Sequence, residues 1–152
     1  MASRAPAASA LQAAIRIGTG IFWLYYASRK WSGVGWMQPV LVQAAAQNPI
    51  PGLHELLVQV VVPHWFGFAF GYAVAETLAG FLLLLGLLSR WAAWLGVLLA
   101  VALALTVAFL EPDLGRRWLF YLAVLVNLAC AAGGPGALAG ERLKGVPRWL
   151  RS

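Results

Sequence analysis

The chain has 152 residues, of which 62% are hydrophobic, and its mean hydropathy is +0.78. A soluble domain of this size cannot hide so much apolar surface in one core, so the composition excludes an ordinary soluble protein and indicates a membrane protein. The net charge of +6 does not predict a nucleic-acid partner, because the cations gather at the ends of the apolar runs, as in membrane proteins.

The first apolar run and the connection after it predict one long helix and two short ones. A helix needs about 20 largely apolar residues to span the hydrocarbon core, and the first run covers about residues 11–28. It has no convincing cleavage site, so we expect a retained helix. The connection 29–64 contains MQPVLVQAAAQN and GLHELLVQVVV, each predicted to form a short helix on the outer membrane face.

Three further apolar runs follow the connection, at about residues 65–88, 91–110 and 118–134. Short links join them, so consecutive helices are expected to be antiparallel neighbours. The sequence therefore predicts an all-α protein with one membrane domain, a four-helix bundle with a long outer connection that contains short helices.

Charges and tryptophans at the ends of the runs predict the topology. The cytoplasmic side collects more basic residues if both termini lie in the cytoplasm. The basic tail 137–152, which contains ERLKGVPRWLRS, is expected to lie on anionic lipid on that side. We therefore expect a multi-pass protein of the cell's inner (cytoplasmic) membrane, with cytoplasmic N- and C-termini.

Charged residues inside two of the runs are the main functional signal. Glu76 is the single charge between residues 65 and 88. A helical projection gives each of two long helices one inward-facing stripe of residues. The stripe of the first helix is Arg16, Gly20, Trp23, Ala27 and Lys30. The stripe of the second long helix is Glu76, Gly80, Leu83, Leu87 and Arg90. A stripe that combines charges with a glycine indicates helices that approach closely.

The direction of helical side chains predicts the partner of Glu76. Side chains lean toward the N-terminus of their own helix, so on antiparallel helices Lys30 and Glu76 lean toward one another and should form an ion pair. Arg16 leans the other way and is expected to snorkel to the inner interface, near Arg90 or a lipid phosphate. An ionisable group at the bilayer centre costs about 2.5–3.5 kcal/mol and tends to mark function. The alternatives are a ligand- or proton-handling role and a buried pair that fixes helix register.

Weaker candidates lie near the mouth of the second long helix. His64 and Trp65, with Tyr72 further along, could line a quinone headgroup site; an ordinary interfacial histidine is the alternative for His64. The other histidine, His54, also lies in the connection, so the pair of facing histidines that a transmembrane haem needs is missing and no haem is expected. We also expect no metal. The single Cys130 excludes an internal disulfide and is expected to be buried.

Three segments resemble one known family. RIGTGIFWLYYASRKW resembles the first helix of DoxX/DoxD-like membrane proteins, with an Arg, a Gly, a Phe and a Lys at the family's spacing. AETLAGFLLLLGLLSRWA resembles their second-helix signature, and GGPGALAGERL is similar to the Gly-Pro-Gly end of their fourth helix. The long first connection looks most like the DoxD, or small-subunit, branch associated with thiosulfate:quinone oxidoreductase. Two positions depart from the pattern: Ala27 replaces a frequent glycine, and the Asp after Gly-Pro-Gly is missing.

This resemblance implies a membrane subunit of a quinone-linked oxidoreductase that receives electrons from a partner subunit and uses quinone as cofactor. Glu76 and Lys30 are the expected catalytic residues, and the expected cofactor-binding residues are His64, Trp65, Tyr72, Arg16 and Arg90. The alternative is a non-catalytic anchor or scaffold subunit of a larger membrane complex. A solute transporter is a third interpretation, but its paired repeats are not evident.

Overall fold

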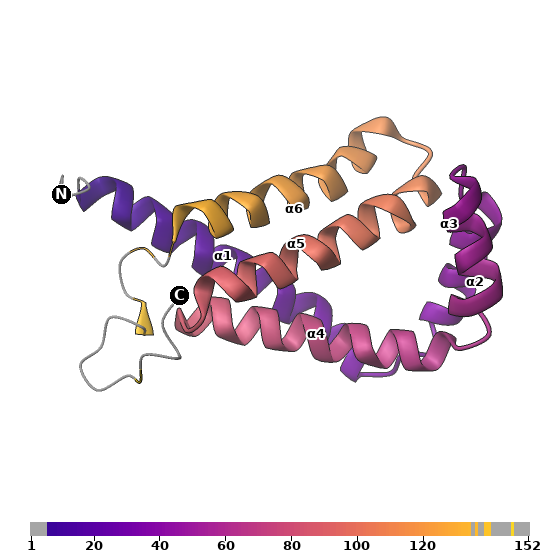
Figure 1. Ribbon diagram of the computed structural model, residues 1–152, viewed down its shortest axis with the longest axis horizontal. Coiled ribbons are helices and arrows are strands. Elements are labelled where there is room, and N and C mark those ends of the chain that lie inside the picture. The colour runs from indigo at the N-terminus through magenta and orange to yellow at the C-terminus, as the bar shows by residue number, and fades with distance from the viewer. Residues whose placement is uncertain (1–5, 135, 137–138, 141–146, 148–152) are drawn as a thin grey trace.

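The computed structural model describes residues 6–134, 136, 139–140 and 147 (Figure 1). These residues form helices and connecting turns and contain no strand, which confirms the prediction of an all-α protein. In chain order the elements are α1 (Pro6–Trp31), α2 (Met37–Gln47), α3 (Pro51–Leu56), the π-helical segment η1 (Leu57–Val61), α4 (Trp65–Leu85), α5 (Ser89–Leu105), the 3-10 segment η2 (Val107–Leu110) and α6 (Leu114–Gly133). Most of the basic tail predicted at 137–152 lies outside the described residues.

Three helical segments are long and apolar enough to cross a membrane: Trp65–Leu85, Ser89–Leu110 and Leu114–Gly133. They match the last three predicted runs to within a few residues, and they indicate a protein that associates with a lipid bilayer. α1 has 26 residues but is not among the three. It is also less apolar, since it carries Arg16, Arg29 and Lys30.

The long helices lie alongside one another, and the short ones cross one end of them (Figure 1). α1 packs chiefly on α4, and α5 packs on both α4 and α6, whereas α1 and α6 touch much less. α2 and α3 lie at the end opposite to the start of α1 and the end of α6 (Figure 1). We call residues 37–61, which comprise α2, α3 and η1, the cap.

The cap confirms the two short helices predicted in the connection, and a hydrogen bond from Asn48 attaches it to α5. The Asn48 amide donates from Nδ2 to the Leu105 carbonyl at 2.8 Å and accepts from the Ile50 amide at 3.0 Å. His54 Nδ1 lies 2.7 Å from the Ala45 carbonyl, and since a carbonyl can only accept, His54 is the donor. His54 therefore ties two cap helices together.

A tight turn joins α4 to α5. α4 ends at Leu85, a few residues before the predicted end, because Gly86 adopts the left-handed conformation with φ 67°. A β-carbon at Gly86 would lie 2.7 Å from Arg16 Nη1. The turn therefore needs glycine for its backbone conformation and also for the close approach of α1.

Candidate functional site

A buried ion pair joins α1 to α4. Lys30 Nζ lies 2.8 Å from both carboxylate oxygens of Glu76, and the side chains are 5% and 0% exposed. The predicted pairing of Lys30 with Glu76 is confirmed. Both charges are removed from solvent, and each satisfies the other within hydrogen-bonding distance, which is the condition for a buried pair to be tolerated.

Three aromatic rings surround the Lys30 ammonium on its other sides. Nζ lies 5.5 Å from the ring centroid of Tyr72, 5.9 Å from that of Tyr26 and 6.0 Å from that of Trp36. Within about 6 Å the negative face of an aromatic ring attracts a cation. The rings therefore replace part of the hydration that Lys30 loses. They come from α1, α4 and the residue before α2, so the ammonium lies where these three segments meet.

Two glycines allow α1 and α4 to approach this closely. A β-carbon on Gly20 would lie 2.9 Å from the Gly80 carbonyl oxygen, and one on Gly80 would lie 3.0 Å from the Gly20 carbonyl oxygen. These two obstacles are backbone atoms, which cannot rotate away, and the Leu24 side chain also lies 2.7 Å from a β-carbon on Gly80. The inward stripe predicted on α1 is confirmed, because Arg16, Gly20, Trp23, Ala27 and Lys30 are all buried. On α4 the stripe is buried at Glu76, Gly80 and Leu83.

Arg16 does not snorkel to the interface, so that prediction is wrong. Its side chain is 1% exposed, and Nη1 donates to the carbonyls of Leu83 and Leu84, the second at 3.1 Å. The last carbonyls of a helix have no partner within the helix and carry its negative dipole end. They therefore offer a buried cation a better partner than lipid. Arg16 caps α4 from a neighbouring helix.

Arg16 and Arg90 do not join Lys30 in one site. Lys30 follows Arg16 by fourteen positions on α1, which separates them by about 21 Å along the helix axis. Arg90 is exposed in the first turn of α5, beside the turn at the end opposite to the cap. The five residues predicted to bind a cofactor are thus divided between the two ends of the bundle.

The other predicted binding residues lie near a groove on the α4–α5 side, with a volume of about 450 Å³. We call it the histidine groove; its lining residues are His64, Gly67, Phe68, Gly71, Tyr72, Ala75 and Leu99. His64 and Tyr72 are therefore brought together as predicted, whereas Trp65 is outside the lining and its ring packs on Phe66 at 5.8 Å. A β-carbon on Gly67 or Gly71 would meet nothing within 4 Å. Gly67 and Gly71 therefore form the open floor of this groove.

Tyr72 connects the histidine groove to the ion pair. Its hydroxyl donates to the Leu99 carbonyl of α5, its side chain lines the groove, and its ring faces Lys30 Nζ. Lys30 and Glu76 are not among the lining residues. The residues predicted to be catalytic therefore lie outside the groove lining, and Tyr72 contacts both Lys30 and the groove.

His64 has a defined hydrogen-bonding role at the groove edge. Its Nδ1 lies 2.9 Å from the Val60 carbonyl, so Nδ1 carries the proton. In the neutral ring Nε2 is then an acceptor, and in the protonated ring it is a donor. His64 can therefore accept a hydrogen bond from a hydroxyl group or donate one to a carbonyl group.

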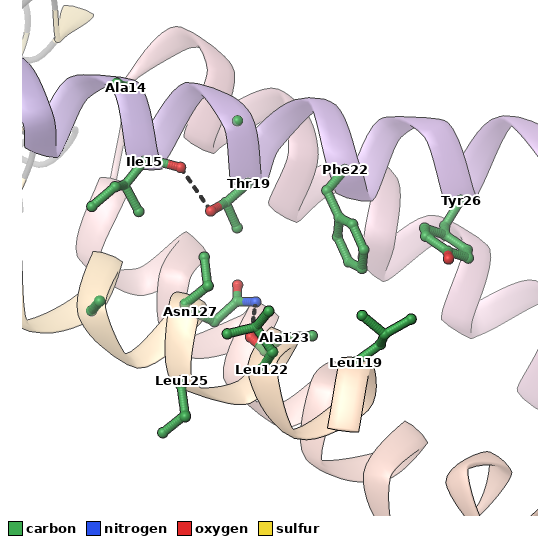
Figure 2. A pocket seen from close by; sticks show the side chains of 13 residues that line it. Ala14, Ile15, Thr19, Phe22, Tyr26, Leu119, Leu122, Ala123, Leu125 and Asn127 are labelled. Carbon is green, nitrogen blue, oxygen red and sulfur yellow. Dashed lines mark hydrogen bonds between the residues drawn. The ribbon is translucent and has the colours of Figure 1, made fainter. Parts of the chain in front are cut away.

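A second groove, between α1 and α6, was not predicted from the sequence. It has a volume of about 580 Å³ and is shown in Figure 2; we call it the α1–α6 groove. Asn127 lies at its floor, where its Oδ1 accepts from Trp23 Nε1 at 3.1 Å. Cys130 is buried beside it, 3.5 Å from Thr19 Oγ1. A sequence signal did exist: Ala14 and Gly18 are small, lie four residues apart and are both exposed on α1.

Among the described residues, no group of three or more His, Cys, Asp or Glu side chains is placed to hold a metal ion. Comparisons of the chain with models of protein families, with curated proteins and with solved structures find no match. The resemblance to DoxX/DoxD-like proteins therefore stays a prediction, and the geometry of the two grooves and the ion pair carries the functional argument.

Proposed function

We propose that this chain is an integral membrane subunit of a quinone-linked oxidoreductase complex and that its histidine groove receives the quinone headgroup. In this proposal α1 crosses the bilayer with α4, α5 and α6 as a four-helix bundle of the DoxX/DoxD type. α1 is less apolar than the others, but two of its cations, Arg16 and Lys30, are buried against partners on α4. Their charges therefore do not face lipid.

One observation carries the proposal: Tyr72 belongs both to the histidine groove and to the aromatic surround of Lys30. The groove offers a floor of Gly67 and Gly71, over which a flat ring can lie close to the backbone. Its volume of about 450 Å³ falls within the range of about 300–1,000 Å³ for small-molecule sites. A quinone headgroup therefore fits the residues that are present.

A bound quinone would supply two-electron, two-proton redox chemistry. The protonated His64 ring would donate from Nε2 to a ring oxygen of the oxidised form. The neutral ring would accept at Nε2 from a hydroxyl group of the reduced form. Lys30 and Glu76 would position Tyr72 and fix the local field behind it, because their ionic groups lie next to the Tyr72 ring in a site that excludes water. We assign the electron donor to a partner subunit, as the resemblance implies.

The same proposal sets the orientation. The cap lies on the outer face of the cell's inner membrane, and both termini lie in the cytoplasm, which follows the distribution of cations along the sequence. The histidine groove then opens in the outer half of the bundle, next to the cap, since His64 directly precedes α4.

A second candidate function is a non-catalytic scaffold subunit, and one observation favours it. Glu76 is fully buried and both of its oxygens contact Lys30. A pair enclosed in this way can act as a pin that fixes the register of α1 against α4, as buried polar groups do in other helical assemblies. The scaffold needs the ion pair but does not need the histidine groove.

Filling the histidine groove distinguishes the two candidate functions, the quinone-binding subunit and the scaffold. The protein is purified in mild detergent, its lipids are extracted and quinone is counted per chain. We expect stoichiometric quinone in the wild type and its loss in Gly71→Leu, whose side chain would enter open space at the floor. The matched control is Gly18→Leu, which makes the same change in the other groove and should keep quinone. Wild-type protein without quinone, or an unchanged content in Gly71→Leu, supports the scaffold.

A further inference from the structure

The α1–α6 groove opens where the two helices separate. α1 and α6 meet at Thr19 with Cys130 and at Trp23 with Asn127. Toward the cap, Phe22 and Tyr26 point from α1 into the space opposite Leu119 and Leu122 of α6 (Figure 2). The groove therefore runs between α1 and α6 from Ala14 and Ala129, past the polar side chains of Thr19 and Asn127, to Tyr26 and Leu119 toward the cap. Its α6 wall belongs to a helix that is apolar enough to span a membrane.

The polar groups of the floor are already satisfied, so the groove suits an apolar occupant. Thr19 Oγ1 donates to the Ile15 carbonyl at 2.8 Å, and Asn127 Nδ2 donates to the Ala123 carbonyl at 2.8 Å; both bonds are drawn in Figure 2. Asn127 Oδ1 accepts from Trp23. An occupant therefore gains by covering apolar side chains, and it needs no polar group at this depth.

The size of the groove suits a hydrocarbon chain better than a helix. Ten residues of helix, about 15 Å long and about 10 Å across, fill on the order of 1,200 Å³. The groove holds about 580 Å³. A helix could enter only with a ridge of side chains, whereas an acyl chain can follow the groove to its floor. The bilayer around α6 supplies such chains.

Two arginines stand at the cap end of the groove, one on each wall. Arg29 follows Tyr26 by three positions on α1, and Arg116 precedes Leu119 by three positions on α6. Residues three apart share a helix face, so each arginine continues the lining of its wall by one turn. Both are exposed, and the Arg29 guanidinium lies 5.7 Å from the Trp36 ring centroid. This is the level at which a lipid headgroup would sit.

Three other charged side chains at this end have contacts of their own, and the carboxylates of Glu55, in α3, and Glu111, after η2, also lie here. Lys30 is paired with Glu76. Arg117 Nη2 donates to the Glu111 carbonyl at 2.8 Å, and the Asp113 carboxylate accepts from the Gly115 amide at 2.8 Å. The exposed cations at the cap end of the groove are therefore Arg29 and Arg116. An anion between them would complement both walls.

We propose that the α1–α6 groove binds a phospholipid with an anionic headgroup. One acyl chain lies along the groove as far as Asn127, and the phosphate lies between Arg29 and Arg116. Charge complementarity identifies the occupant: an apolar channel continues into two cations at headgroup depth, the arrangement by which basic pockets between helices bind acidic lipids. The site does not depend on the quinone proposal, because no residue lines both grooves.

The test counts bound lipid. Purified full-length protein in mild detergent receives equal amounts of phosphatidylglycerol and phosphatidylcholine with the same acyl chains, and native mass spectrometry measures each bound lipid. We expect phosphatidylglycerol to bind more tightly. Arg29→Gln with Arg116→Gln should lower its affinity roughly fivefold for each arginine removed and leave phosphatidylcholine unchanged. Gly18→Leu, which fills the groove, should lower the binding of both lipids.

The control is Gly67→Leu, which makes the same change in the histidine groove and should leave both lipids bound. Equal binding of the two lipids by the wild type overturns the proposal, as does phosphatidylglycerol binding that survives the double arginine substitution. A dimer in which the groove faces a second copy, and which Gly18→Leu disrupts, also overturns it. The arginine variants change only exposed side chains, so they report on the lipid even if the groove-filling variant folds poorly.

Discussion

α1 packs against α4 and α6 in opposite ways. Toward α4 it presents Gly20, and the backbones come close enough for a buried ion pair to form between Lys30 and Glu76. Toward α6 it presents Phe22 and Tyr26, and a groove of about 580 Å³ remains between the helices. In lipid the hydrophobic effect does not favour one helix contact over the other, so close packing and polar contacts decide which helices associate. The α1–α4 contact has both, whereas the α1–α6 contact keeps a few polar contacts and an opening.

The largest effect should come from breaking the ion pair on one side only. Glu76→Gln leaves the Lys30 ammonium buried without a counter-charge, which costs about 3–5 kcal/mol. We expect a much lower thermal midpoint in detergent. Replacing both partners, as Lys30→Met with Glu76→Leu, removes the unmatched charge and should restore most of the loss. A single variant as stable as the wild type would show that the pair does not hold α1 against α4.

The next effect should come from the glycine contact, and it has a matched control on the same helix. A β-carbon on Gly20 would lie 2.8 Å from the Leu84 amide nitrogen, whereas one on Gly18 would meet nothing within 4 Å. Gly20→Val should therefore destabilise the protein by about 1–3 kcal/mol or more through overpacking. Gly18→Val should stay within about 0.5 kcal/mol. Thermal unfolding monitored by circular dichroism compares the two, and equal losses would contradict the packing described.

The smallest effect should come from one of the polar contacts between α1 and α6, the hydrogen bond from Trp23 to Asn127. Asn127→Ala removes the acceptor of Trp23 Nε1 and should cost about 1–2 kcal/mol. Trp23→Phe removes the donor, so it should cost less in the Asn127→Ala background than in the wild type. The double-mutant cycle measures this coupling. Additive losses would show that the hydrogen bond does not contribute to the α1–α6 contact.

The α1–α4 half of the molecule could be predicted from the sequence because it depends on helical periodicity. Lys30 and Glu76 were paired from the lean of helical side chains, and the buried stripe of α1 followed from its 3.6-residue repeat. The order of the helices and the two short cap helices also followed from apolar runs and breakers. The histidine groove was anticipated only in part: His64 and Tyr72 were selected, but the open floor at Gly67 and Gly71 was not.

The errors arose where helix ends and crossing angles matter. The second long run was predicted to continue to residue 88, which hid the helix-end carbonyls of Leu83 and Leu84; α4 stops at Leu85, and Arg16 binds them. The last helix was predicted to start at residue 118. It starts at Leu114, because the Asp113 carboxylate caps it. The α1–α6 groove depends on how far two helices diverge, and its signal in the sequence is the pair of small residues Ala14 and Gly18.

The burial of Arg16 and Lys30 has a consequence for biogenesis. The ribosome delivers α1 to the insertion machinery before α4 has been made, and each of these cations would cost about 2.5–3.5 kcal/mol at the membrane centre on insertion scales. Their partners, the Glu76 carboxylate and the Leu83 and Leu84 carbonyls, emerge from the ribosome later. In the proposed four-helix bundle, stable integration of α1 must therefore wait for α4, so a chain truncated before α4 should leave α1 in the aqueous phase or at the membrane surface.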